Sequence, residues 1–91
     1  MEAKIKIKKW VGGEPWSHGT VTLGNGRAFT FHMKHFENPS DFGIDGGRIS
    51  KLDIRTAATD KAVVNYDRGW DIKPRTSDHK AVLNALKAKY N

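Results

Sequence analysis

The sequence predicts an α+β domain in which an antiparallel sheet of about five strands carries one C-terminal helix packed on one face. Short runs that alternate between apolar and polar residues, separated by glycine-rich turns, indicate the strands. Apolar residues at helical spacing follow Pro74 and indicate the helix. With 91 residues and no internal repeat, the chain is expected to form a single domain spanning residues 1–91.

The strands are expected at residues 3–10, 19–23, 27–35, 48–55 and 62–66. In the first strand the isoleucines point to one side and the intervening lysines to the other, as in a strand with one buried face. The second and third strands form a predicted hairpin. A two-residue turn would put their apolar residues on opposite faces, whereas a three-residue loop with a left-handed Gly26 pairs Val21 with Phe29. We therefore expect the three-residue loop.

Three features of the later chain refine this prediction. Ile49 is out of phase with the apolar residues that follow it, which indicates a bulge near Ser50. In the long loop after the third strand, Phe42 and Ile44 are expected to tuck back against the core. Residues 70–72 are expected to extend the fifth strand after a glycine bend.

The helix is expected to begin with Thr76 or Ser77 as its N-cap and to carry Asp78 in its first turn. Its apolar stripe should pack across the apolar face of the sheet, because an open sheet needs such a cover. The stripe consists of Val82, Leu83, Leu86 and Tyr90.

The amino-acid composition excludes some classes of function and favours others. The chain has no cysteine, which excludes disulfides and thiol chemistry and favours a reducing compartment. It shows neither a signal-like apolar N-terminus nor a membrane-spanning run, so we expect a cytoplasmic protein. Sixteen basic residues against ten acidic ones give a formal charge of +6, which favours polyanionic partners.

Catalytic and metal-binding patterns are weak. His32 and His35 lie an odd number of residues apart on one strand, so they face opposite sides and do not form a ligand pair. The segment 41–46 has some acidic residues of a calcium loop but lacks the third acidic ligand and the final glutamate. No serine and histidine spacing indicates a nucleophilic triad. We therefore expect a protein without enzymatic activity, metal or cofactor.

Cations near exposed aromatic side chains give the stronger signal, since stacking combined with phosphate attraction is how single-stranded nucleic acid is bound. Tryptophans in a small β domain more often belong to the core, so both interpretations stay open for each of them. The predicted nucleic-acid or partner-binding residues are Lys4, Lys6, Lys8, His32, Lys34, Arg48, Lys51, Arg55, Arg68 and Trp70.

Three stretches are similar to a family of short uncharacterised proteins encoded by phages and conjugative elements of Firmicutes. They are His18-Gly19-Thr20-Val21, the segment from Phe42 to Leu52, and Asn65-Tyr66-Asp67-Arg68-Gly69-Trp70-Asp71. The resemblance carries no established activity. It implies a context in which small proteins regulate genes or block host defence complexes, CRISPR effectors included.

Three functions follow as hypotheses. The first is a non-catalytic binding protein of a phage or mobile element that engages nucleic acid or a nucleoprotein complex through a basic sheet face, in the manner of an anti-CRISPR inhibitor. The alternative is a protein–protein module or homodimer that does not bind nucleic acid. The third is a small enzyme that uses His18 or His35 with a nearby aspartate.

Overall fold

The computed structural model describes residues 3–7, 16–36 and 38–91. Within these residues, six strands precede a single α-helix. The elements are β1 (Ala3–Ile7), β2 (Trp16–Leu23), β3 (Ala28–His35), the 3₁₀ turn η1 (Ile44–Gly46), β4 (Ile49–Thr56), β5 (Ala62–Asp67), β6 (Trp70–Ile72) and α1 (Ser77–Tyr90).

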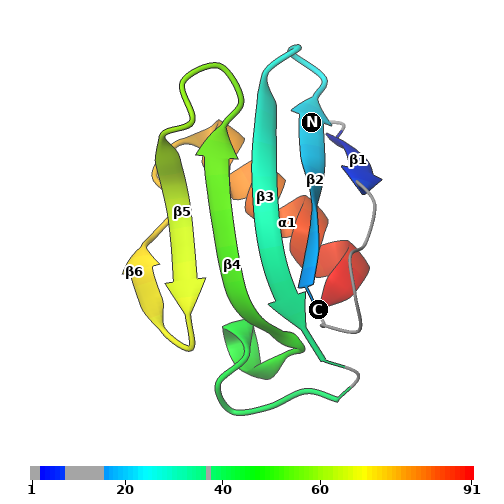
Figure 1. The fold of residues 1–91 in the computed structure, drawn as a ribbon, viewed down its shortest axis with the longest axis vertical. Helices are drawn as coiled ribbons and strands as arrows, with labels where there is room; N and C mark the ends of the chain where they lie inside the picture. Colours follow the sequence, from blue (N-terminus) through cyan, green and yellow to red (C-terminus); the bar gives the residue numbers. More distant parts are fainter. Residues whose placement is uncertain (1–2, 8–15, 37) are drawn as a thin grey trace.

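The strands form one antiparallel sheet in the order β1-β2-β3-β4-β5-β6, and α1 crosses behind it (Figure 1). The α+β class is therefore confirmed. The strand count is one higher than expected because residues 70–72 do not extend β5. The chain reverses at Arg68 and Gly69, and Trp70 pairs with Tyr66 as a separate edge strand.

The hairpin between β2 and β3 has the predicted three-residue loop, with Val21 opposite Phe29. Gly26 has a φ of 87°, in the left-handed region that the loop requires. The backbone N–H of Leu23 donates to the carbonyl of Arg27 at 2.9 Å and closes the loop. This register places Val21, Leu23, Phe29, Phe31 and Met33 on the side that faces α1, where all five are buried.

The predicted bulge on β4 is also confirmed. Lys34 pairs with Lys51, but the next residue, His35, pairs with Ile49, so Ser50 has no opposite residue on β3. The extra residue changes the phase of the strand, and Ile49 becomes fully buried together with Ile54.

The loop before β4 confirms one predicted plug and corrects the other. Ile44 is fully buried, but the side chain of Phe42 is 61% exposed. The reason is local geometry. The Tyr66 hydroxyl donates to the Phe42 carbonyl at 2.8 Å, and Gly43 donates to the carbonyl of Ser40 at 3.1 Å. With the backbone fixed in this way, Ile44 faces the core and the Phe42 ring faces solvent.

The helix begins as predicted, with the Thr76 hydroxyl accepting a hydrogen bond from the backbone N–H of His79 at 3.1 Å. Asp78 is buried in the first turn and forms an ion pair with Arg27 at 2.8 Å, which ties the helix to the β2–β3 loop. The apolar stripe packs against the sheet, with Val82 and Leu86 fully buried.

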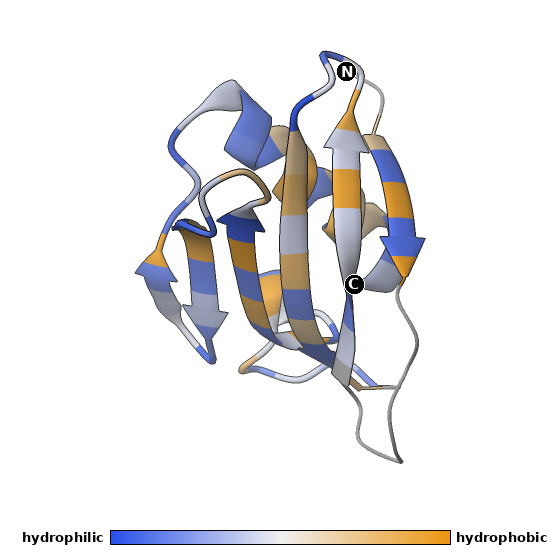
Figure 2. Cartoon of the chain, turned by 45° about the horizontal axis from the view of Figure 1, so that its top comes forward, coloured by the Kyte–Doolittle hydropathy of each residue, from blue (hydrophilic) through white to orange (hydrophobic). Residues whose placement is uncertain are grey.

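The alternation that predicted the sheet is visible as stripes of apolar and polar residues along the strands (Figure 2). On β1 the alternation holds for Ile5, which packs against the core, and for the exposed Lys4 and Lys6. Ile7 is 43% exposed, contrary to its predicted burial. It lies opposite Gly19 at the strand end, and glycine has no side chain to cover it.

Candidate nucleic-acid interface

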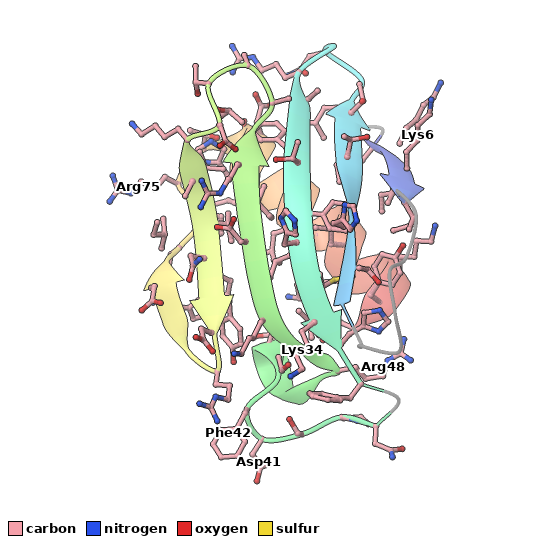
Figure 3. The ribbon with its side chains drawn as sticks, viewed as in Figure 1. Lys6, Lys34, Asp41, Phe42, Arg48 and Arg75 are labelled. Carbon is pink, nitrogen blue, oxygen red and sulfur yellow. The ribbon has the colours of Figure 1, made fainter. Side chains whose placement is uncertain are left out.

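The side of the sheet opposite α1 is the candidate interface, and we call it the open face. Among the described elements none lies over it, and its side chains project toward the viewer in Figure 3. The strand register arranges these side chains in rows. The rows are Thr20, Thr30 and Arg55; His18, His32, Asp53 and Asn65; and Lys34, Lys51 and Asp67.

The open face carries the predicted binding residues His32, Lys34, Lys51 and Arg55, but acidic residues lie among them. Arg55 forms an ion pair with Asp53 at 2.7 Å, and Lys51 forms one with Asp67 at 3.7 Å. The carboxyl of Asp53 also accepts a hydrogen bond from the side chain of Asn65 at 3.2 Å. Each of these pairs lowers the local positive potential, so the face is a mosaic of both signs.

Other cations lie away from the open face. They are carried by the loops and by α1, behind the sheet, and comprise Arg27, Lys61, Lys73, Arg75, Lys80, Lys87 and Lys89. The helix is not docked against the lysines of β1, however, so Lys4 and Lys6 remain exposed at the edge of the sheet.

The remaining predicted residues divide into three positions. Arg68 lies in the β5–β6 turn at a φ of 55°, with its side chain 66% exposed. Arg48 precedes β4, close enough to His35 for its charge to act on that ring. Trp70 lies on the core side, where its ring contacts Tyr66 edge to face at 5.0 Å, so it does not belong to the open face. Lys8 lies outside the described residues.

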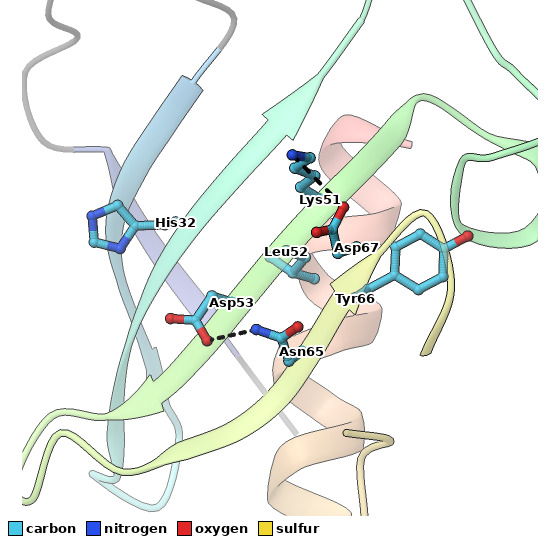
Figure 4. Close-up of a pocket in the computed structure, with 7 residues that line it drawn as sticks. All are labelled: His32, Lys51, Leu52, Asp53, Asn65, Tyr66 and Asp67. Carbon is cyan, nitrogen blue, oxygen red and sulfur yellow. Dashed lines mark hydrogen bonds and ion pairs between the residues drawn. The ribbon is translucent and has the colours of Figure 1, made fainter. Parts of the chain in front are cut away.

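A shallow depression of about 230 Å³ lies at the centre of the open face, between β3, β4 and β5 (Figure 4). Its polar lining is His32, Lys51, Asp53, Asn65 and Asp67. The ring of His32 stacks on His18 of β2 at 5.4 Å between centroids. His32 and Lys51 are among the site residues predicted from the sequence, whereas Asp53 and Asn65 are not. Asp53 shares the strand parity of Lys51 and Arg55, and that parity could have placed it on this face.

A second depression of about 330 Å³ lies where β3 ends and β4 begins. We call it the rim pocket, and it is lined by Lys34, Phe36, Ser40, Phe42, Ser50, Lys51 and Arg68. It brings together three of the predicted cations with two exposed phenylalanines that were not predicted as site residues. Sequence gives no signal for these rings, because a phenylalanine in a small domain usually belongs to the core.

The two histidines with perturbed pKa values lie on the side of α1. Burial lowers the pKa of His35, and the charge of Arg48 lowers it further. His35 lies within hydrogen-bonding distance of the Ser17 hydroxyl at 3.3 Å and packs against Tyr90. Burial likewise lowers the pKa of His79, with Asp78 acting in the opposite direction. Within residues 3–7, 16–36 and 38–91, no three histidine or carboxylate side chains gather as a metal site would need.

Fold and site together define a small α+β domain in which a helix covers one face of an antiparallel sheet and the other face carries polar and charged side chains. Residues 15–91 match the family described as Domain of unknown function (DUF7678), and the chain belongs to that family. No curated protein and no solved structure matches the chain. In the described part of the chain, no helix has the length and apolarity needed to cross a membrane.

Proposed function

We propose that this chain is a binding domain without catalytic activity, and that it contacts nucleic acid, alone or within a nucleoprotein complex, through the open face and its rim. One observation carries the proposal: the sheet face opposite α1 presents lysine, arginine, histidine and threonine where a covered face would present apolar side chains. Such groups donate to phosphate and sugar oxygens, and a sheet surface is a common platform for unpaired bases.

The charge of the molecule supports a polyanionic partner. The formal charge of +6 attracts phosphate at long range, and the exposed Lys4 and Lys6 add two cations at the edge of the open face. Asp53 and Asp67 lie among the cations of the open face and repel phosphate, so a polyanion is not expected to contact the whole face. Contact is therefore expected at the β1 edge and at the rim, with the centre contributing hydrogen bonds from His32 and Asn65.

The resemblance to short proteins of phages and conjugative elements supports a setting for this binding. A nucleoprotein complex of a host defence system offers both exposed RNA or DNA and an advantage to the mobile element that blocks it. An anti-CRISPR inhibitor of this kind needs a shaped surface and no catalysis.

The test is fluorescence anisotropy with labelled single-stranded DNA, single-stranded RNA and duplex DNA over a series of salt concentrations. We expect binding at low salt. The logarithm of the binding constant should fall linearly with the logarithm of the salt concentration, with a slope of about 0.7–0.9 per phosphate contacted. Replacing Lys4 and Lys6 by Gln should reduce that slope. The matched control replaces Lys80 and Lys89 of α1 by Gln, which removes the same charge from the opposite side of the molecule. No binding to any of the three probes at low salt would overturn the proposal.

A protein–protein interface is the second candidate, favoured by the exposed rings of Phe36 and Phe42 at 44% and 61%. Aromatic side chains are enriched at such interfaces. Light scattering on the purified chain separates the two candidates, because a homodimer through this surface would double the mass without nucleic acid.

A further inference from the structure

The rim pocket holds two exposed phenylalanines in a chain that buries its other two. Phe29 and Phe31 are 4% and 1% exposed, whereas Phe36 and Phe42 are 44% and 61% exposed. A phenylalanine left partly in water forgoes part of the free energy that burial would contribute. Two such rings lining one depression are typical of an interaction surface.

The Phe42 ring is held outward by a fixed backbone. Its carbonyl accepts the Tyr66 hydroxyl, and the following Ile44 is fully buried as an anchor. Ser40 donates its backbone N–H to the carbonyl of Gly47 at 3.1 Å, which closes the loop on the other side. The backbone that carries the ring is thus fixed, and binding to the ring does not require the loop to be ordered first.

The cations of the rim pocket come from three different segments. Arg68 is aimed by the tight β5–β6 turn, where its backbone N–H donates to the Ser50 carbonyl at 3.0 Å. Lys51 reaches the pocket from β4, and Lys34 lies with its ammonium 5.4 Å from the centre of the Phe36 ring. Lys51 and Arg68 lie 3.7 and 3.9 Å from the same carboxylate, that of Asp67, so the two cations share one negative charge.

The rim pocket combines two aromatic rings with three cations at one end of the sheet. The labelled side chains show Phe42 and Lys34 at the same end of the sheet, with Asp41 at the outer tip of the loop (Figure 3). A volume of about 330 Å³ is at the lower end for small-molecule pockets and suits one nucleotide, not the width of a duplex. Duplex bases are stacked inside the helix and cannot reach a side-chain ring, whereas an unpaired base can stack on it.

We propose that the rim pocket binds one unpaired nucleotide of a single strand, with its base stacked on Phe42 and its phosphate held by Lys51 and Arg68. This inference rests on the proposed nucleic-acid function and specifies its substrate class. Ser40 also lines the pocket and is exposed, so its hydroxyl adds a group that can bond the sugar or the phosphate.

The test compares variants by anisotropy against a labelled single strand of about 12 nucleotides, within the range of site sizes of small single-strand-binding domains, and the matching duplex. Stacking on one aromatic ring contributes about 1–3 kcal/mol, so Phe42→Ala should weaken single-strand binding by roughly 5- to 150-fold and leave duplex binding unchanged. Phe42→Tyr retains the ring and should bind as the natural chain does. Phe42→Leu retains apolar bulk without the ring and should behave like alanine.

The phosphate contact has a separate readout. Lys51→Gln should reduce the salt slope of single-strand binding by about 0.7, the contribution of one phosphate, whereas Phe42→Ala should leave the slope unchanged. Lys61→Gln is the matched control, since it removes an exposed charge from the β4–β5 loop at the other end of β4. Phe42 is exposed, so its variants should keep the fold, and circular dichroism verifies this.

Three results would overturn the inference. If the natural chain and Phe42→Ala bind single strands equally well, the rim pocket is not the nucleotide site, and the proposed function still stands. If the natural chain binds no nucleic acid, both the rim-pocket inference and the proposed function are wrong. Self-association that is lost in Phe42→Ala, measured by light scattering without nucleic acid, would assign the exposed rings to a protein interface.

Discussion

Asp67 is the acidic residue that most directly opposes an anionic ligand at the rim. Its carboxylate lies 3.7 Å from the Lys51 ammonium and 3.9 Å from Nε of Arg68, and its side chain is 52% exposed. Asp67→Asn keeps the shape of the side chain and removes its charge. If a phosphate binds to these two cations, the substitution should tighten binding, because it deletes a repulsion and releases both donors.

The size of the effect follows from Coulomb's law. A phosphate that contacts both cations would lie about 6 Å from the Asp67 carboxylate, and at the dielectric constant of water this repulsion is about 0.7 kcal/mol. Salt at physiological concentration, with a screening length of about 8 Å, reduces it to about 0.3 kcal/mol. The expected gain in affinity is therefore about 1.7-fold at physiological salt, and it should rise toward about threefold at low salt.

Anisotropy titration with a labelled single strand at two salt concentrations measures this gain. Asp71→Asn is the matched control, since Asp71 is exposed on β6 and takes part in none of the ion pairs found in the described residues. The loss of two exposed ion pairs should reduce stability by roughly 0–1 kcal/mol at most. If Asp71→Asn gains as much affinity as Asp67→Asn, the effect is due to net charge and not to the position of Asp67. Weaker binding by Asp67→Asn would refute the reasoning.

Three further predictions concern the scaffold. Leu86→Ala leaves a cavity at a fully buried site of α1 and should lower the free energy of unfolding by about 2–5 kcal/mol in urea titrations. The volume-conserving Leu86→Met should lower it by less than about 1.5 kcal/mol. A loss below about 1.5 kcal/mol for the alanine variant would show that α1 does not pack as described. Gly19→Ala would place its Cβ 2.0 Å from the Lys6 carbonyl oxygen, so β1 should separate and its amides should exchange faster than those of β3; unchanged protection would contradict the strand pairing. Because burial lowers the folded-state pKa of His35 and His79 below the unfolded value of about 6.5, stability should be full above that pH and fall as the pH drops toward the folded pKa values. His35→Gln should flatten the pH dependence of the urea midpoint, and a midpoint that rises on acidification would reverse the assigned sign.

The sequence predicted those parts of the fold that depend on side-chain parity. The register of the β2–β3 hairpin followed from the requirement that Val21 and Phe29 share a face, and the bulge at Ser50 followed from the phase of Ile49. Both are one-dimensional patterns with a single consistent solution. The same logic placed His32 and Lys34 on the open face, where they are found.

What the sequence could not supply depends on contacts between distant segments. The Phe42 ring is exposed because Tyr66, far along the chain, holds its carbonyl. Trp70 turned to the core because the chain reverses at Arg68 and pairs Trp70 beside Tyr66. The rim pocket likewise joins segments from β3 to the β5–β6 turn. No local sequence pattern predicts these long-range contacts. The acidic residues that lie among the cations, and the exposed phenylalanine rings, were therefore found only from the structure.

The strictly sequential strand order bears on how the chain folds as it is made. Each hairpin can form from residues that are adjacent along the chain, which keeps sequence separations short and favours fast folding. The exception is α1, the final element, whose Asp78 must return to Arg27 of the first hairpin loop. Until that helix leaves the ribosome, the sheet exposes the side chains of its future core. A nascent or truncated chain without α1 should therefore be the species that chaperones bind and that aggregates.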